Sequence, residues 1–116
     1  MKIYQYLFSA KSMKGKILRI KVGIYSLVEP ICKEKFWIHW YGAYNLDPKN
    51  VVFWICVKTD REKEKLELDL DLMEKIRFLL VKYNYPEEAR KYVYIGFESQ
   101  ETVNRESNGD WYLHFK

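Results

Sequence analysis

The sequence predicts a single α+β domain in which one main helix packs on one face of a mostly antiparallel sheet of five to six strands, in the order β-β-β-β-α-β-β. The first half of the chain consists of short runs of alternating apolar and polar residues separated by turn residues, as in antiparallel strands. The second half contains one stretch with apolar residues at helical spacing, followed by two aromatic-rich runs. The length of 116 residues suits one domain.

Four strands are expected in the first half of the chain. Alternation of apolar and polar side chains predicts them over residues 3–9, 17–25, 36–44 and 51–59. A turn at 12–15 joins the first two strands. The polar segment 45–50 joins the third to the fourth, and such short connections favour antiparallel neighbours.

The pattern after Asp60 indicates a helix. Asp71 followed by Glu74 resembles a capping box, and apolar residues then recur at helical spacing. The helix is expected to run from there to about Asn84, while an earlier start at Glu62, with Asp60 as its cap, stays open. The apolar positions are Leu72, Met73, Ile76, Leu79, Leu80 and Tyr83.

Two more strands are expected after the helix. Residues 86–88 begin one further helical turn, and residues 92–97 and 111–115 have the aromatic-rich composition of strands. If the first of these strands adjoins the fourth strand, the two run parallel with a right-handed crossover. Asn108-Gly109, which precedes the last strand, is the dipeptide most favoured in tight hairpin turns.

Composition predicts a globular protein, and no cofactor is expected. Hydrophobic residues make up 48% of the chain and charged residues 31%. No apolar run approaches the roughly 18 residues of a membrane span, so we expect no membrane segment and a cytoplasmic location. Cys32 and Cys56 lack CxxC spacing, which favours free thiols over a disulfide or a metal site.

The first half of the chain is basic. Residues 1–58 hold ten Lys/Arg against three Asp/Glu, whereas residues 59–116 hold ten against thirteen. Basic side chains on an N-terminal hairpin suit an anionic partner, but they also keep an edge strand soluble and prevent edge-to-edge pairing. The densest group is Lys11, Lys14, Lys16, Arg19 and Lys21.

One helix covers only one face of the predicted sheet, so the other face must meet solvent or a partner. Alternation places aromatic side chains with polar tips on this second face, and such side chains suit a half-exposed recognition surface. Cross-strand packing, closure by the loop around Cys32 or homodimerisation would also account for them. The candidates are Tyr4, Tyr6, Trp37, His39, Tyr41, Trp54, Tyr92, Tyr94, Tyr112 and His114.

The segment between the last two predicted strands is acidic and is expected to form a rim beside this face. It either extends as a hairpin arm or forms an ordered loop capped by Ser99. Its length exceeds that of a common hairpin loop, which favours a binding role over a solvated connector. The candidate binding residues of this acidic rim are Glu98, Glu101, Arg105, Glu106 and Asp110.

The sequence contains no nucleophile elbow, phosphate-binding loop, dinucleotide-binding glycine pattern or zinc-protease pattern. An enzyme would need His39, His114 and a carboxylate to converge in a cleft. A single-stranded nucleic-acid binder would need the basic hairpin beside the aromatic strands, which themselves carry no interleaved Lys/Arg. Both remain alternatives to a non-catalytic binding protein.

The last third of the chain, YNYPEEARKYVYIGFESQETVNRESNGDWYLHFK, resembles the C-terminal end of small, uncharacterised bacterial single-domain proteins, some of which look like immunity proteins. The resemblance rests on the runs GFESQETV and GDWYLHF. It implies a protein that neutralises a partner protein, such as a toxin, by covering it, and it implies no catalytic residues. We therefore expect a cytoplasmic protein that binds a partner protein through the aromatic sheet face and the acidic rim.

Overall fold

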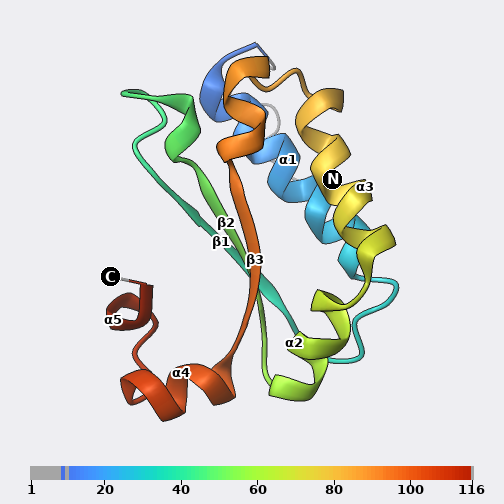
Figure 1. Cartoon of the computed structure of the whole chain (residues 1–116), viewed down its shortest axis with the longest axis vertical. Helices are drawn as coiled ribbons and strands as arrows, with labels where there is room; N and C mark the ends of the chain where they lie inside the picture. Colours follow the sequence, from blue (N-terminus) through green and yellow to red (C-terminus); the bar gives the residue numbers. More distant parts are fainter. Residues whose placement is uncertain (1–8, 10, 116) are drawn as a thin grey trace.

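A three-stranded sheet separates a layer of two long helices from two short C-terminal helices (Figure 1). The computed structural model describes residue 9 and residues 11–115. In chain order the elements are α1 (Met13–Val28), β1 (Trp37–Tyr41), the 3-10 helix η2 (Pro48–Asn50), β2 (Val52–Val57), α2 (Asp60–Glu67), α3 (Leu70–Lys82), the 3-10 helix η3 (Glu87–Tyr92), β3 (Tyr94–Ser99), α4 (Gln100–Ser107) and α5 (Trp111–Phe115).

The sheet has the strand order β1-β2-β3, with β2 in the centre. β1 pairs antiparallel with β2, and β2 pairs parallel with β3. The strands before and after the main helix are thus neighbours, the case in which a parallel pairing was expected. The segment α2–α3–η3 makes the long connection that parallel neighbours require.

The core lies between one face of this sheet and the layer formed by α1 and α3 (Figure 1). The sheet contributes Phe53 and Ile55, which are fully buried, and α3 contributes Ile76 and Leu80. Full burial of each such side chain stabilises the fold by about 1.5–3 kcal/mol. The buried side chains of α1 include Ile17, Ile20, Ile24 and Val28.

The predicted α+β class is confirmed, but the predicted sheet of five to six mostly antiparallel strands with one main helix is wrong. The sheet of the described residues has three strands of mixed direction. Residues 17–25 form part of α1, so the second predicted strand and the basic hairpin built on it do not exist. The first predicted strand, 3–9, lies outside the described residues except for Ser9.

The segment 17–25 misled because two periodicities overlap in it. Leu18, Ile20, Val22 and Ile24 alternate as in a strand, yet the most deeply buried positions of α1 recur every three to four residues. The helix begins after Ser12, whose hydroxyl accepts a hydrogen bond from the Gly15 amide at 3.0 Å. Residues Lys14, Lys16, Arg19 and Lys21 of the basic group therefore lie on a helix.

The last predicted strand, 111–115, is also wrong, because these residues form α5. The side chain of Asp110 accepts a hydrogen bond from the Leu113 amide at 3.0 Å, as a helix N-cap does. Asn108 and Gly109 adopt positive φ angles of 52° and 79°, which end α4 instead of turning a hairpin. Ser99 does act as a cap, since its side chain accepts from the Thr102 amide, but the segment forms helix α4 and is neither the hairpin arm nor the loop expected.

The helix predicted between residues 71 and 84 is confirmed as α3. Its start could not be decided from the sequence because two separate helices follow each other here. Thr59 caps a separate helix, α2, and Asp69 caps α3 by accepting from the Leu72 amide at 3.0 Å. The expected helical turn after Pro86 is η3. None of the helices within the described part of the chain is both long and apolar enough to cross a membrane.

Candidate functional site

Five of the candidate aromatic residues share the sheet face that is turned away from α1 and α3. Trp37, His39 and Tyr41 alternate along β1, and strand pairing places His39 directly opposite Trp54 of β2. The rings of Trp54 and Tyr94 lie 5.1 Å apart, so β3 joins the same surface. We call this surface the aromatic face.

Gly96 makes room for two of these rings. It lies opposite Trp54 on β3, and a Cβ atom there would come within 2.6 Å of the Tyr94 ring and 2.9 Å of the Trp54 ring. Real Cβ contacts are essentially never shorter than 3.0 Å. A glycine at this position therefore leaves room beside β3 for the two rings, which are tilted by 54° to each other.

Helix α5 lies across the aromatic face and covers part of it. Phe115 stacks on Trp54, with ring centroids 4.8 Å apart and an interplanar angle of 17°. Trp111 meets Trp37 edge-on at 5.4 Å, and its indole N–H donates to Gln100 Oε1 at 2.7 Å. Offset stacked and edge-on ring pairs contribute about 0.5–1.5 kcal/mol each beyond the area that they bury.

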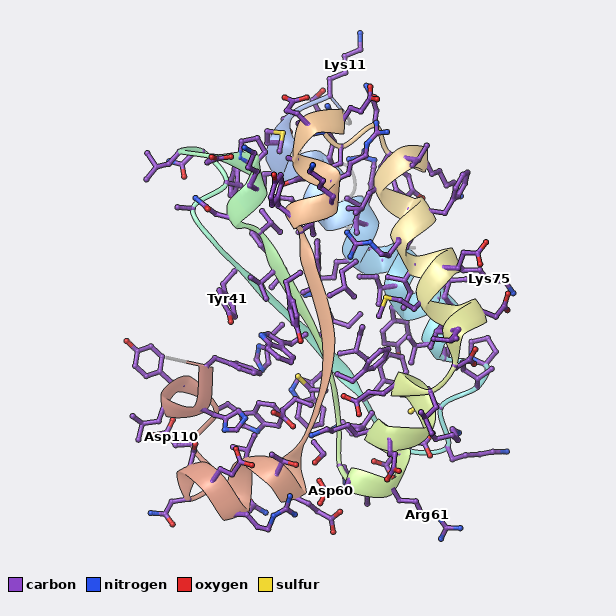
Figure 2. All side chains as sticks on the ribbon, in the orientation of Figure 1. Lys11, Tyr41, Asp60, Arg61, Lys75 and Asp110 are labelled. Atoms are coloured by element: carbon purple, nitrogen blue, oxygen red, sulfur yellow. The ribbon has the colours of Figure 1, made fainter. Side chains whose placement is uncertain are left out.

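A groove of about 540 Å³ remains open between β1 and α5, on the side of the sheet where Figure 2 labels Tyr41. Three consecutive residues of β1 line the groove. β1 is an edge strand of the sheet, so the groove lies beside that edge. That edge is unpaired within the described residues, because β1 pairs with β2 alone. The lining residues are His39, Trp40, Tyr41, Trp111, Tyr112 and Phe115.

A buried ionic cluster fastens α5 to the end of β3. Glu98, which is 8% exposed, accepts hydrogen bonds from His114 Nε2 at 2.7 Å and from Lys63 Nζ at 2.9 Å. The other ring nitrogen of His114 lies 3.0 Å from the hydroxyl of Ser107. We call Lys63, Glu98, Ser107 and His114 the clasp, because they connect α2, β3, α4 and α5.

The clasp keeps Glu98 ionised. Burial alone would raise the pKa of its carboxyl group, but the hydrogen bonds from Lys63, His114 and the Ser99 amide outweigh burial and lower the pKa below 4.5. Both nitrogens of His114 have partners with the imidazole neutral or protonated, because the Ser107 hydroxyl can donate or accept. Ser107, His114 and Glu98 form a serine–histidine–carboxylate series, and their contacts join α4, α5 and β3.

A second network closes the start of α2, close to where Figure 2 labels Asp60. Asp60 accepts hydrogen bonds from the hydroxyls of Ser99 and Thr102 and from the guanidinium of Arg105. These hydrogen bonds hold the pKa of Asp60 well below its usual range. Glu101 in turn accepts from the Asp60 amide at 2.7 Å. The N-terminus of α2 is thus occupied by the protein's own carboxylates.

The predicted acidic rim is only partly a surface feature. Glu98 turns inward to the clasp, whereas Glu101 and Arg105 engage α2. Glu106 and Asp110 are exposed at the end of α4 and before α5. The structure therefore leaves two of the predicted rim carboxylates at the surface, of which Asp110 also caps α5 through the Leu113 amide.

The two histidines do not converge on one carboxylate. Both contact Phe115, with ring centroids 6.1 Å away for His39 and 5.6 Å away for His114, but it is His114 that bonds Glu98. Burial, together with the charge of Lys21, lowers the pKa of His39. Among the side chains that the structure describes, no three His, Cys, Asp or Glu are grouped to hold a metal ion.

Sequence reasoning missed Trp40, Trp111 and Phe115 in the groove and Lys63 and Ser107 in the clasp. Trp111 and Phe115 are four residues apart, the spacing that places two side chains on one face of a helix, but they were assigned to a strand. Tyr112 does line the groove as a candidate, whereas Tyr92 lies on η3. Tyr4 and Tyr6 fall outside the described residues.

Comparisons with protein-family models, with curated proteins and with solved structures find no match to this chain. The resemblance of the C-terminal third to immunity proteins therefore stays a prediction.

Proposed function

We propose that this protein binds another protein, and that the groove between β1 and α5 receives an aromatic or large aliphatic side chain from an extended segment of that partner. The observation that carries the proposal is the aromatic groove at the edge of β1 that no other described strand pairs with. Clefts that bind side chains are commonly lined by apolar and aromatic groups with a few polar atoms. A role in covering a partner, as immunity proteins do, agrees with this proposal.

The edge of β1 explains why the partner segment should be extended. An unpaired strand offers backbone N–H and C=O groups to an added strand, which gains affinity from those hydrogen bonds. Side chains of the added strand alternate, so every second one can reach the groove. Tyr41, which is 40% exposed, lies where the edge and the groove meet.

Two features give the groove its specificity. Trp111 and Phe115 are held in place by α5 and by stacking, so binding need not order them. The exposed carboxylates Glu106 and Asp110 lie on the same C-terminal helical layer and favour a partner with basic residues beside its apolar one.

Selection from a phage-displayed library of random peptides tests the proposal. We expect enriched peptides to carry an aromatic or large aliphatic residue, and the synthetic peptide to change the tryptophan fluorescence, because Trp40 and Trp111 line the groove. Tyr112→Ser removes one wall of the groove and should weaken binding at least about tenfold.

Tyr92→Ser is the matched control. Tyr92 is 52% exposed, but it lies on η3 beside Lys49 and Lys91. We expect the control to bind the peptide as the wild type does. Failure to enrich any peptide, or equal loss of binding in both variants, would refute the proposal.

A further inference from the structure

The outer side of α3 carries an exposed apolar patch that belongs to neither the core nor the groove. Phe78 is 59% exposed and Val81 is 49% exposed, although both lie among buried residues of the helix. A shallow hollow of about 660 Å³ passes over them and over Leu27 of α1. Figure 2 labels Lys75 on this side of α3, away from the sheet.

Charges flank this patch in a definite order along α3. Glu74 lies one turn before Phe78, and Lys82 lies one turn after it, and both side chains are exposed. The helix macrodipole favours an acidic residue near the N-terminus of a helix and a basic residue near its C-terminus. It can therefore explain the order of the charges, but nothing more. It does not account for a phenylalanine exposed between the two.

We propose that this face of α3 pairs with the same face of a second copy of the chain, antiparallel about a two-fold axis at Phe78. Residues equally far from Phe78 then face each other, so Glu74 of each copy meets Lys82 of the other. The two ion pairs surround a centre made by the Phe78 and Val81 side chains of both copies. The interface is self-complementary in charge.

This pairing leaves the groove free. Helix α3 lies on one side of the sheet, whereas α5 and the aromatic face lie on the other (Figure 1). The proposed dimer would therefore present two grooves to a partner, and its test does not depend on the function proposed for the groove.

Sedimentation equilibrium of the full chain tests the dimer. We expect a mass that rises with concentration to twice the 14.2 kDa of one chain. Glu74→Lys and Lys82→Glu each place like charges opposite one another and should raise the dimer dissociation constant at least about tenfold. The double variant Glu74→Lys with Lys82→Glu restores opposite charges and should recover most of the wild-type association.

Glu106→Lys is the matched control, because it makes the same change of charge at an exposed position on α4. We expect it to associate as the wild type does, and circular dichroism verifies the fold of each variant. A wild-type mass of one chain at all concentrations would overturn the proposal. So would a double variant that associates as weakly as the single variants.

Discussion

The carboxyl group of Glu98 is the acceptor that joins Lys63 and His114 in the clasp, so replacing it tests whether the clasp stabilises the fold. We predict that Glu98→Gln lowers the free energy of unfolding by about 2 kcal/mol. The replacement keeps the size of the side chain but removes its charge. Both Lys63 Nζ, at 2.9 Å, and His114 Nε2, at 2.7 Å, then lose their charged acceptor.

The magnitude follows from the two charge-assisted hydrogen bonds. A hydrogen bond to a charged group contributes about 1.5–3 kcal/mol, compared with about 1 kcal/mol for a neutral one, so each loses about 1 kcal/mol. The side chain of Glu98 is 10% exposed and that of Lys63 is 23% exposed, so solvent replaces little of the loss. A change of 2 kcal/mol corresponds to a fall in Tm of about 8 °C for a domain of this size.

The loss depends on pH in a definite direction. The pKa of Glu98 is lowered from 4.5 in the folded protein, so its contribution is fully present above about pH 4.5 and disappears as the pH falls through the folded pKa. Glutamine has no such dependence. The difference in unfolding free energy between wild type and Glu98→Gln should therefore be largest near neutral pH and should shrink in acid.

Urea unfolding followed by far-ultraviolet circular dichroism measures this difference at each pH. Glu106→Gln is the control, because Glu106 is exposed on α4, and it should change stability by less than about 0.5 kcal/mol. A cost for Glu98→Gln as small as that of the control, or a cost that stays the same in acid, would refute the reasoning.

Three further substitutions test the aromatic face and its supports. Gly96→Ala should destabilise the fold by about 1–3 kcal/mol and alter the near-ultraviolet circular dichroism, because the new Cβ displaces the Trp54 ring. Phe115→Ala should shift tryptophan emission to longer wavelength and cost about 1–2 kcal/mol, because Trp54 loses its stacked ring; unchanged emission would contradict that packing. Gly42→Ala should cost at least about 2 kcal/mol in thermal unfolding, since Gly42 has a φ of 125° and a Cβ would lie 2.1 Å from the Asn50 carbonyl oxygen; wild-type stability would argue against this turn.

Local patterns predicted β1, β2 and α3, because β1 alternates, β2 is a short apolar run and α3 repeats at helical spacing. In β1, Trp37, His39 and Tyr41 alternate with residues of the opposite face, and this alternation placed the aromatic face correctly. The segment of α1 fits both a two-residue and a helical period. Its β-branched residues favour a strand locally. The helix forms because it buries one face in the core that α1 shares with α3.

The candidate site was only partly predictable because its cover comes from a misassigned segment. In a strand, Trp111, Leu113 and Phe115 would all lie on one face. The sequence does not reveal next to which strand residues 111–115 would pair. Folded as α5, they place both rings on the aromatic face. Asp110 was the available sign of a helix, because its side chain caps α5 by accepting from the Leu113 amide. The sequence analysis interpreted it as a charge of the acidic rim instead.

The four tryptophan indole N–H groups provide the most direct test of the groove. Trp40 and Trp111 line it, whereas Trp37 and Trp54 lie beneath its lining, Trp37 against Trp111 and Trp54 against Phe115. We therefore propose to titrate nitrogen-15-labelled protein with a peptide enriched from the random library and to follow the four indole signals by NMR. Binding in the groove predicts that the signals of Trp40 and Trp111 move most, and largest changes at Trp37 and Trp54, or none at all, would contradict it.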